Sequence, residues 1–313
     1  MEVKTPSTLR EAISHFANPD NCVAYMVAKR WPSGVTCPTC GNTRVSYEAT
    51  AWRWQCSSHH PKRKFSLKTG TVLEDSPLGL DKWLPVVWLV TNCKNGVSSW
   101  EIHRAVGVTQ KTAWFMLQRA RLALQGKNGG KLSGEIEADE TLIGGKARNM
   151  HPGKREKARG RDNFGKTIVA AVLERGGEVR ARVVKTRRKR ELQELVRENV
   201  EVGTNLYTDE LKSYDGLDEY KHEVINHADT YVNGQIHTNG MENFWSLLKR
   251  GLKGTYVSVE PFHLFRYIDE QVFRYNNRKD MNDADRFDLA VSQIVGKRLT
   301  YKELTGHQND EPF

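Results

Sequence analysis

The stretch KTIVAAVLERGGEVRARVV, residues 166–184, predicts a pair of β-strands and decides the class of the fold. Apolar residues recur with a period close to two on both sides of Gly176-Gly177, a pair typical of a turn between strands. A further strand with the same pattern is expected at residues 134–143, GEIEADETLI. The second half of the chain therefore begins as a β-rich segment.

Helices alternate with strands beyond this segment. RKRELQELVREN at 188–199 predicts a helix, and NLYTDEL at 205–211 predicts another strand. MENFWSLLKRGL at 241–252 and PFHLFRYIDEQVFRYNNR at 261–278 predict two closing helices. This mixture indicates an α/β domain. A loop rich in Lys and Arg, residues 148–163, separates the first two strands.

The first half of the chain is organised differently. Two helical stretches fill residues 1 to about 30, a turn-rich segment with cysteines follows from 35 to 72, and a helical pattern returns from Leu80 to about Leu124. The polar, glycine-rich segment 125–130 is the expected domain boundary. A chain of 313 residues is long enough for about two domains.

Composition narrows the class of partner. The chain has 48 Lys and Arg against 38 Asp and Glu, which gives a net charge of +10 and a pI near 9.3. A basic balance of this kind is typical of proteins that bind nucleic acid. No apolar stretch is long enough to span a membrane, and the N-terminus lacks the pattern of a signal peptide. We expect a cytoplasmic protein, associated with the nucleoid through DNA.

The segment VTCPTCGNTRVSYEATAWRWQCSSHH, residues 35–60, predicts a zinc ribbon. Cys37 and Cys40 form a C-x2-C pair, and Cys56 with His59 forms a C-x2-H pair, although the neighbouring His60 is an alternative fourth ligand. Two close pairs of nitrogen and sulfur ligands suit one tetrahedral Zn²⁺ ion. In so small a module the metal would supply much of the folding free energy.

Residues 98–121, SSWEIHRAVGVTQKTAWFMLQRAR, predict a helix-turn-helix. A short helix, a turn at Gly107 and a second helix capped by Thr109 match that motif. The second helix of such a motif lies in the major groove, so Gln110, Lys111 and Thr112 are the expected DNA contacts. An ordinary helical hairpin is the alternative.

Three acids are candidates for a metal site. Asp139 lies in the apolar strand at 134–143, Asp209 ends the strand at 205–211, and Glu242 opens the helix at 241–252. Carboxylates at the ends of neighbouring strands and on one helix can converge on Mg²⁺, which prefers oxygen ligands. Two such ions promote displacement at a phosphodiester. A single acid of this kind is far more often a solvated or ion-paired carboxylate, and only the three together indicate a metal site.

These stretches resemble a known family, the DDE-type insertion-sequence transposases of the ISXO-like group, which carry an N-terminal zinc ribbon. The similarity covers nearly the whole chain. It is carried by CPTCG, KFSLKTGTVLEDSPLGLDKW, ADETLIGGK, YTDELKSYDGL, and HTNGMENFWSLLKRGLKGTY with FRYNNR after it. The ribbons of that group usually have a fourth Cys, in whose place this sequence has His59 or His60.

The resemblance implies an RNase H-like catalytic domain, a mixed sheet flanked by helices, in which Asp139, Asp209 and Glu242 hold two Mg²⁺ or Mn²⁺ ions. Lys249 lies about two helical turns beyond Glu242 and faces the same way, so Lys249 and Arg250 are expected to hold DNA phosphates. Accessory roles are expected for His237 and Asn239. The loop at 148–163 and the run at 187–190 are further candidates for phosphate contacts, or else are solvated surface.

The resulting hypothesis is a transposase that binds the terminal inverted repeats of a bacterial insertion sequence, cuts its 3′ ends and joins them to target DNA as a homodimer or larger assembly. The alternatives are a DNA-binding regulator that does not need the acids, and an RNase H-like nuclease or resolvase that cuts without joining. The expected divisions are a helical lead-in at 1–34, a zinc ribbon at 35–75, a helix-turn-helix region at 80–125, a catalytic domain at 132–295 and a C-terminal tail at 296–313.

Overall fold

The structure is a computed structural model that describes residues 5–126, 129–145, 151–153, 156, 164–225 and 239–306. The chain divides into two compact units. One unit comprises the described residues of Met1–Gly126 and Asn277–Phe313, and the other comprises those of Lys127–Asn276. In the part of the chain that the structure describes, no helix has the length and apolarity needed to cross a membrane.

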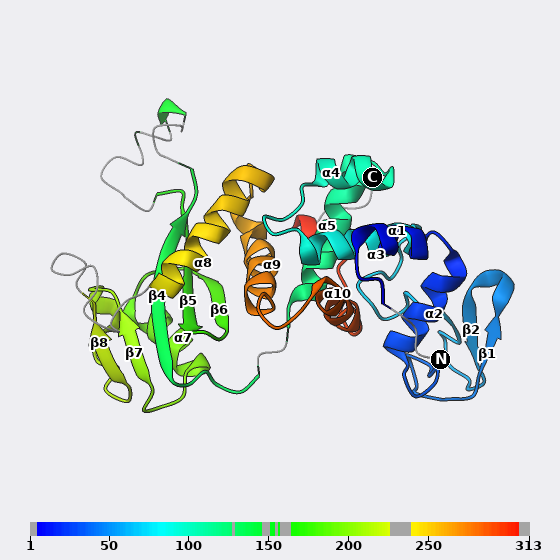
Figure 1. The fold of residues 1–313 in the computed structure, drawn as a ribbon, viewed down its shortest axis with the longest axis horizontal. Coiled ribbons are helices and arrows are strands. Elements are labelled where there is room, and N and C mark those ends of the chain that lie inside the picture. Colours follow the sequence, from blue (N-terminus) through cyan, green and yellow to red (C-terminus); the bar gives the residue numbers. More distant parts are fainter. Residues whose placement is uncertain are drawn as a thin grey trace. The chain divides into compact units, whose positions relative to one another are not determined.

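The first unit is mainly helical (Figure 1). Its helices are α1 (Leu9–Phe16), α2 (Pro19–Arg30), α3 (Leu80–Asn92), α4 (Ser99–Val106), α5 (Gln110–Leu124), α10 (Asp283–Ser292) and α11 (Tyr301–Thr305). Sequence signals fix several of their ends. Ser98 and Glu101 form a capping box at the start of α4, and Asn282 and Asp285 form another at the start of α10.

A small antiparallel sheet belongs to the same unit. Its strands, β1 (Val45–Glu48), β2 (Arg53–Cys56) and β3 (Lys64–Ser66), pair in the order β1-β2-β3. The short helix η1 (Ala49–Ala51) connects the first two. Trp54 of β2 stacks on Phe65 of β3 with ring centroids 6.1 Å apart, and Trp31 contacts both rings edge-on. These three rings form an aromatic cluster in the core of the ribbon.

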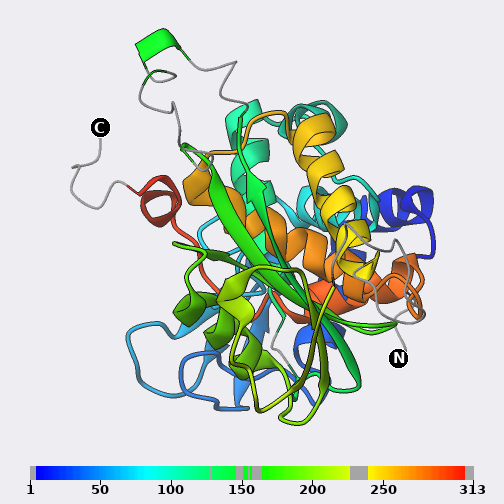
Figure 2. The ribbon, with the colours of Figure 1, turned by 90° about the vertical axis from the view of Figure 1, so that its left-hand side faces the viewer.

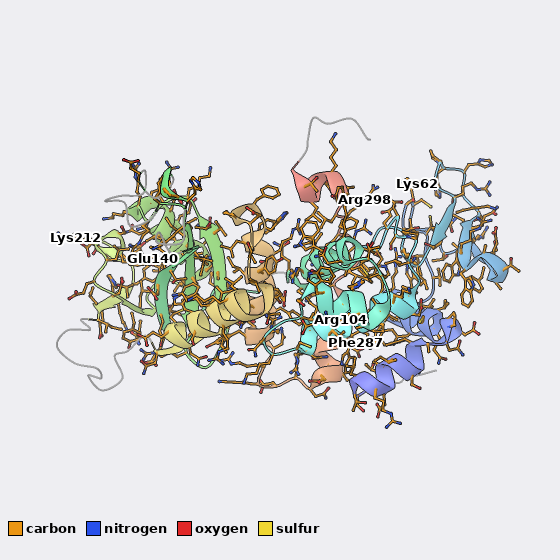
Figure 3. The ribbon with its side chains drawn as sticks, turned by 90° about the horizontal axis from the view of Figure 1, so that it is seen from above. Lys62, Arg104, Glu140, Lys212, Phe287 and Arg298 are labelled. Atoms are coloured by element: carbon orange, nitrogen blue, oxygen red, sulfur yellow. The ribbon has the colours of Figure 1, made fainter. Side chains whose placement is uncertain are left out.

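The C-terminal segment returns to the first unit. Phe287 of α10, labelled in Figure 3, is fully buried. Its ring stacks on Tyr25 at 5.6 Å and contacts Phe16 and Trp88. The unit that holds the large sheet therefore ends at Asn276, whereas the boundary expected from the sequence lay at 295. Residues 296–306 include the short helix α11 and the buried Leu299 and Leu304.

The second unit is built on a mixed sheet of five strands (Figure 1). The strands are β4 (Glu135–Ile143), β5 (Thr167–Glu174), β6 (Val179–Val184), β7 (Asn205–Thr208) and β8 (Lys221–Val224), in the order β6-β5-β4-β7-β8. β6, β5 and β4 are antiparallel, and β7 and β8 run parallel to β4. The turn expected between β5 and β6 is present, with Gly176 at a φ of 77° that favours glycine.

Helices cover both faces of this sheet (Figures 1 and 2). On one face α7 (Lys189–Asn199) and η3 (Lys212–Tyr214) pack against alternate residues such as Ile136, Ala138 and Ala170. On the other face lie α8 (Asn239–Arg250) and α9 (Leu264–Asn276), against Val169, Ala171 and Leu173. The π-helix η4 (Gly251–Tyr256) continues α8, and η5 (Pro261–His263) precedes α9. The expected α/β class, a mixed sheet flanked by helices, is confirmed.

Candidate active site and zinc site

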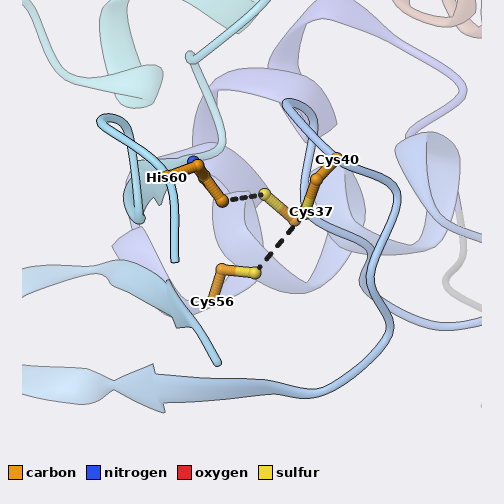
Figure 4. A group of neighbouring side chains, drawn as sticks. All are labelled: Cys37, Cys40, Cys56 and His60. Carbon is orange, nitrogen blue, oxygen red and sulfur yellow. Dashed lines mark hydrogen bonds between the residues drawn. The ribbon is translucent and has the colours of Figure 1, made fainter. Parts of the chain in front are cut away.

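The ribbon brings four side chains of the kind that bind metal to one place (Figure 4). They are Cys37, Cys40, Cys56 and His60, and their ligand atoms all lie within 4.8 Å of one another. Cys37 Sγ is 3.4 Å from His60 Nε2, and Cys40 Sγ is 3.6 Å from Cys56 Sγ. All three cysteines are free of disulfides.

These spacings fit tetrahedral zinc. Ion-to-ligand distances of about 2.3 Å for sulfur and about 2.0–2.1 Å for nitrogen place two sulfurs about 3.8 Å apart, and sulfur and nitrogen about 3.5 Å apart. Burial acts to raise the pKa of the Cys37 thiol, but backbone N–H groups of Cys40 and Thr39 hold it below its usual value. The thiolate is the form that binds metal, so the turn favours the ligand state.

The histidine in this group is His60, the second of the two candidates. His59 is exposed and lies outside the group, so the C-x2-H pair with Cys56 is not formed. The turn after β2 leads to both histidines and is linked to the segment that follows Cys40. Asn42 donates hydrogen bonds to the hydroxyls of Ser57 and Ser58, at 3.1 and 2.6 Å. These bonds hold the turn close to the segment of the Cys37–Cys40 pair.

The helical pair expected at 98–121 is present. Gly107 ends α4 in the left-handed conformation, with a φ of 62°, and the Thr109 hydroxyl caps α5 by accepting a hydrogen bond from Thr112 N at 3.2 Å. The three residues expected to touch DNA lie at the start of α5, and their contacts within the protein differ. Gln110 donates to the Ser99 hydroxyl at 2.8 Å, and Thr112 takes part in the cap. Lys111 is exposed beside the Tyr301 ring.

Two of the three candidate acids meet at one edge of the large sheet. β4 and β7 run parallel, with Ala138 paired with Thr208. The next residues along the two strands are Asp139 and Asp209, which therefore lie side by side where β7 ends. Carboxylate oxygens of Asp139, Asp209 and Glu140 lie within 4.8 Å of one another. Glu140 was not among the residues singled out from the sequence.

Asp139 is held by helix α8. The indole Nε1 of Trp245 donates to Asp139 Oδ2 at 2.8 Å, and the backbone N–H of Glu140 donates to Oδ1 at 2.8 Å. Burial raises the pKa of Asp139 to about 6, the Trp245 bond opposes this rise, and the carboxylates of Glu140 and Asp209 add to it. The charged form of Asp139 is therefore disfavoured mainly by burial and, in smaller part, by the neighbouring carboxylates.

Glu140, labelled in Figure 3, follows Asp139 in β4, and because side chains alternate along a strand it lies on the opposite face. Its Oε1 accepts hydrogen bonds from Arg187, including one from Nε at 2.8 Å, and its Oε2 accepts one from the Tyr214 hydroxyl at 3.1 Å. The sequence offered one signal for it, since it directly follows Asp139. Because side chains alternate along a strand, the sequence predicted that Glu140 would point away from Asp139. The closeness of its carboxylate to Asp139 and Asp209 was therefore not predicted.

Glu242 lies in the first turn of α8 and is exposed. It is not part of the carboxylate group. It precedes Trp245 by about one helical turn and so shares the stripe of α8 that faces Asp139. Lys249 lies on this stripe as well. Burial lowers its pKa, and the nearby Asp139 carboxylate acts in the opposite direction.

A buried ion pair fixes the start of α8. Glu137 of β4 accepts a hydrogen bond from Met241 N at 2.8 Å and pairs with Arg175 at 2.9 Å. A carboxylate in this place satisfies a free N–H of the first turn and is favoured by the helix dipole. Gly240 permits the approach, because a Cβ there would lie 2.9 Å from Glu137 Oε2.

The structure says less about the other predicted site residues. Asn239 is the first residue of α8 and is exposed, and Arg250 at the far end is exposed too. His237 lies outside the described residues, as does most of the basic loop at 148–163. Their expected roles stay predictions.

Comparisons with known proteins agree with this geometry. The model of the ISXO2-like transposase domain matches residues 131–276, and the model of the transposase zinc-ribbon domain matches residues 17–59. An uncharacterized protein in transposable element ISH50 of Halobacterium salinarum is 31% identical over 239 residues, which are 71% of this chain and 79% of that protein. An uncharacterized transposase-like protein of Haemophilus influenzae is 35% identical over 85 residues, 26% of this chain and 68% of that protein.

The domain match spans all five strands of the large sheet, and the ribbon match includes three of the four grouped zinc-ligand candidates. The chain belongs to the ISXO2-like transposase family.

Proposed function

We propose that the protein binds the terminal inverted repeats of its insertion sequence, cuts the 3′ ends of the element and joins them to target DNA. The observation that carries this proposal is the meeting of Asp139 and Asp209 at the ends of parallel strands β4 and β7. Carboxylates so placed suit two Mg²⁺ or Mn²⁺ ions, which activate a water or a 3′-hydroxyl and stabilise the leaving oxygen at a phosphodiester.

The residues present fit divalent metal. Asp139 and Asp209 are partly exposed, so both can be reached by a hydrated ion and by DNA. The Asp209 carboxylate adds to the rise that burial causes in the pKa of Asp139, and a bound cation would favour the charged form instead. Glu242 would complete the ligand set from the first turn of α8, where Glu137 anchors that helix to β4.

Other residues would position the DNA. Trp245 holds Asp139 in one orientation through its indole N–H. Lys249, on the same stripe of α8, would contact a phosphate close to the acids. Such contacts place the strand without reading its sequence. Reading of the element ends would fall to the zinc ribbon and to the α4–α5 pair, where Lys111 is exposed at the start of α5. Because two ends must be joined, we propose a dimer or larger assembly.

Joining is the step that separates a transposase from its alternatives. A labelled duplex with a pre-cut element end is incubated with plasmid target, Mg²⁺ and wild-type protein or D139N, D209N or E242Q. The wild-type protein should produce joined product, whereas the three variants should bind the end and join none. Asp218→Asn is the matched control, since Asp218 is an exposed acid away from the carboxylate group.

Cleavage of an uncut end without joining would instead identify a nuclease. End binding with neither cleavage nor joining, under Mg²⁺ or Mn²⁺, would favour the DNA-binding regulator.

A further inference from the structure

Glu140 is close to the catalytic acids but differs from them in burial. Its side chain is 1% exposed, whereas Asp139 and Asp209 are only partly buried. Both of its oxygens are engaged, Oε1 by Arg187 and Oε2 by Tyr214. A carboxylate in this state has little capacity left for a metal ion that must also bind water and DNA, because each oxygen has two lone pairs to share.

Arg187 is fixed at both its backbone and its guanidinium group. The Ser213 hydroxyl donates to its carbonyl oxygen at 2.6 Å, just before α7 begins. Its Nε and Nη2 both donate to Glu140 Oε1. Its side chain is nevertheless 36% exposed, and the Asp209 carboxylate is near enough to interact with its charge. The guanidinium therefore lies at the accessible edge of the acid group.

The remaining donors of Arg187 point to a ligand. Among the described residues, none accepts a hydrogen bond from Nη1. When a buried acid holds one edge of a guanidinium group, the orientation of the group is fixed. Its remaining N–H donors can then bind a tetrahedral or planar anion. At the edge of a site for a phosphodiester, that anion is a phosphate of the DNA strand.

We propose that Arg187 contacts a DNA phosphate beside the catalytic acids and that Glu140 is its positioning residue rather than a third metal ligand. The inference rests on the proposed function, because it assumes that DNA lies at the carboxylate group. The proposal places two basic side chains, Arg187 and Lys249, on opposite sides of the acids. Arg187 precedes α7 and Lys249 lies on α8, and these helices cover different faces of the sheet.

The first test measures DNA binding without cleavage. Affinity of the full chain for an element-end duplex is measured across salt concentrations with Ca²⁺ in place of Mg²⁺. Ca²⁺ takes oxygen ligands in a looser geometry than Mg²⁺. The R187Q variant should lose one phosphate contact, so the slope of log K against log salt should fall by about one.

Arg182→Gln is the matched control for this experiment. Arg182 is 37% exposed and pairs with Glu198 at 2.6 Å, away from the acids. Its loss should leave the slope unchanged. An unchanged slope in R187Q would overturn the phosphate contact, whether or not the wild-type protein cuts DNA.

The second test is a double-mutant cycle of E140Q and R187Q in single-turnover cleavage, read as a function of Mg²⁺ concentration. Loss of a charged hydrogen bond should slow cleavage about tenfold or more in R187Q. E140Q should slow it less, add nothing in the R187Q background, and leave the half-saturating Mg²⁺ concentration unchanged. R187K should retain part of the cleavage rate, because lysine keeps the positive charge but lacks the planar set of N–H donors of the guanidinium group.

A tenfold rise in half-saturating Mg²⁺ for E140Q, present also in the R187Q background, would show that Glu140 binds metal and would overturn the positioning role. Mg²⁺-induced thermal stabilisation of each variant without DNA gives the same comparison independently of cleavage. If the wild-type protein binds DNA through Arg187 but never cuts it, the proposed catalytic function fails while the phosphate contact stands.

Discussion

The indole N–H of Trp245 donates to Oδ2 of Asp139 at 2.8 Å and so ties helix α8 to the strand that carries the first of the candidate metal-binding acids. Partners of this kind orient metal-binding carboxylates, and their loss typically reduces metal affinity or activity 10–100-fold, as an order of magnitude. Trp245→Phe keeps an aromatic ring but removes the donor. We expect it to raise the Mg²⁺ concentration needed for half-maximal cleavage by about tenfold.

Phe244→Leu is the control for that substitution, because Phe244 is buried on the same helix and packs beside Trp245 but has no hydrogen-bond donor in its side chain. It should lower thermal stability but leave the Mg²⁺ dependence in place. Equal Mg²⁺ dependence for W245F and the wild-type protein would refute an orienting role for the indole.

The pKa of Asp139 predicts how the metal-free protein responds to pH. Burial raises this pKa from about 3.8 to about 6, so the folded state binds the proton more tightly than the unfolded state. The resulting stabilisation is fully present below pH 4 and is lost as pH rises to about 6. In Asp139→Asn the side chain does not ionise, so the variant does not undergo this loss of stability. The melting temperature of D139N relative to the wild-type protein should therefore climb between pH 4 and pH 6 in chelator and stay level above.

Zinc binding should depend on one of two adjacent histidines. His60→Ala removes the fourth candidate ligand and should lower zinc retention and loosen the ribbon, because a bound metal supplies much of the folding free energy of so small a module. His59→Ala, the matched control, should keep one zinc per chain, since His59 is exposed outside the group. Zinc content after dialysis against a weak chelator measures both. Loss of zinc in H59A alone would reverse the assignment.

Gly240 should resist substitution for a steric reason. A Cβ at this position would lie 2.9 Å from both Glu137 Oε2 and Leu173 Cδ2, and Glu137 is pinned by Arg175 and by Met241 N. We expect Gly240→Ala to destabilise the protein by about 1–3 kcal/mol in urea unfolding. Gly254→Ala has open space around it and should be neutral. Similar stabilities for the two variants would contradict the close packing of α8.

Local patterns were enough to predict much of this fold. Alternating apolar residues predicted strands β4, β5 and β6, and Gly176-Gly177 predicted the turn between the last two. The cysteine spacing predicted three of the four grouped metal ligands. Each of these features depends on residues close together in the sequence.

Features set by tertiary packing were not predictable in the same way. The return of α10 to the first unit depends on Phe287 meeting Phe16, Tyr25 and Trp88, which are remote in sequence. The proximity of Glu140 to the acids depends on the register of β4 against β7 and on Arg187 at the start of another helix. The grouping of His60 rather than His59 with the cysteines depends on the path of the chain after β2, which the spacing of two adjacent histidines does not decide.

The measurement that tests the central claim most directly is single-turnover 3′-end cleavage of a labelled element-end duplex with Mg²⁺. Wild-type protein is compared with D139N, D209N and E242Q, with D218N as control and end binding scored in parallel. The account predicts that the three variants bind the end and cut it at least about a thousandfold more slowly, while the control cuts normally. Cleavage by any of the three at the wild-type rate would contradict the assignment of that acid as catalytic.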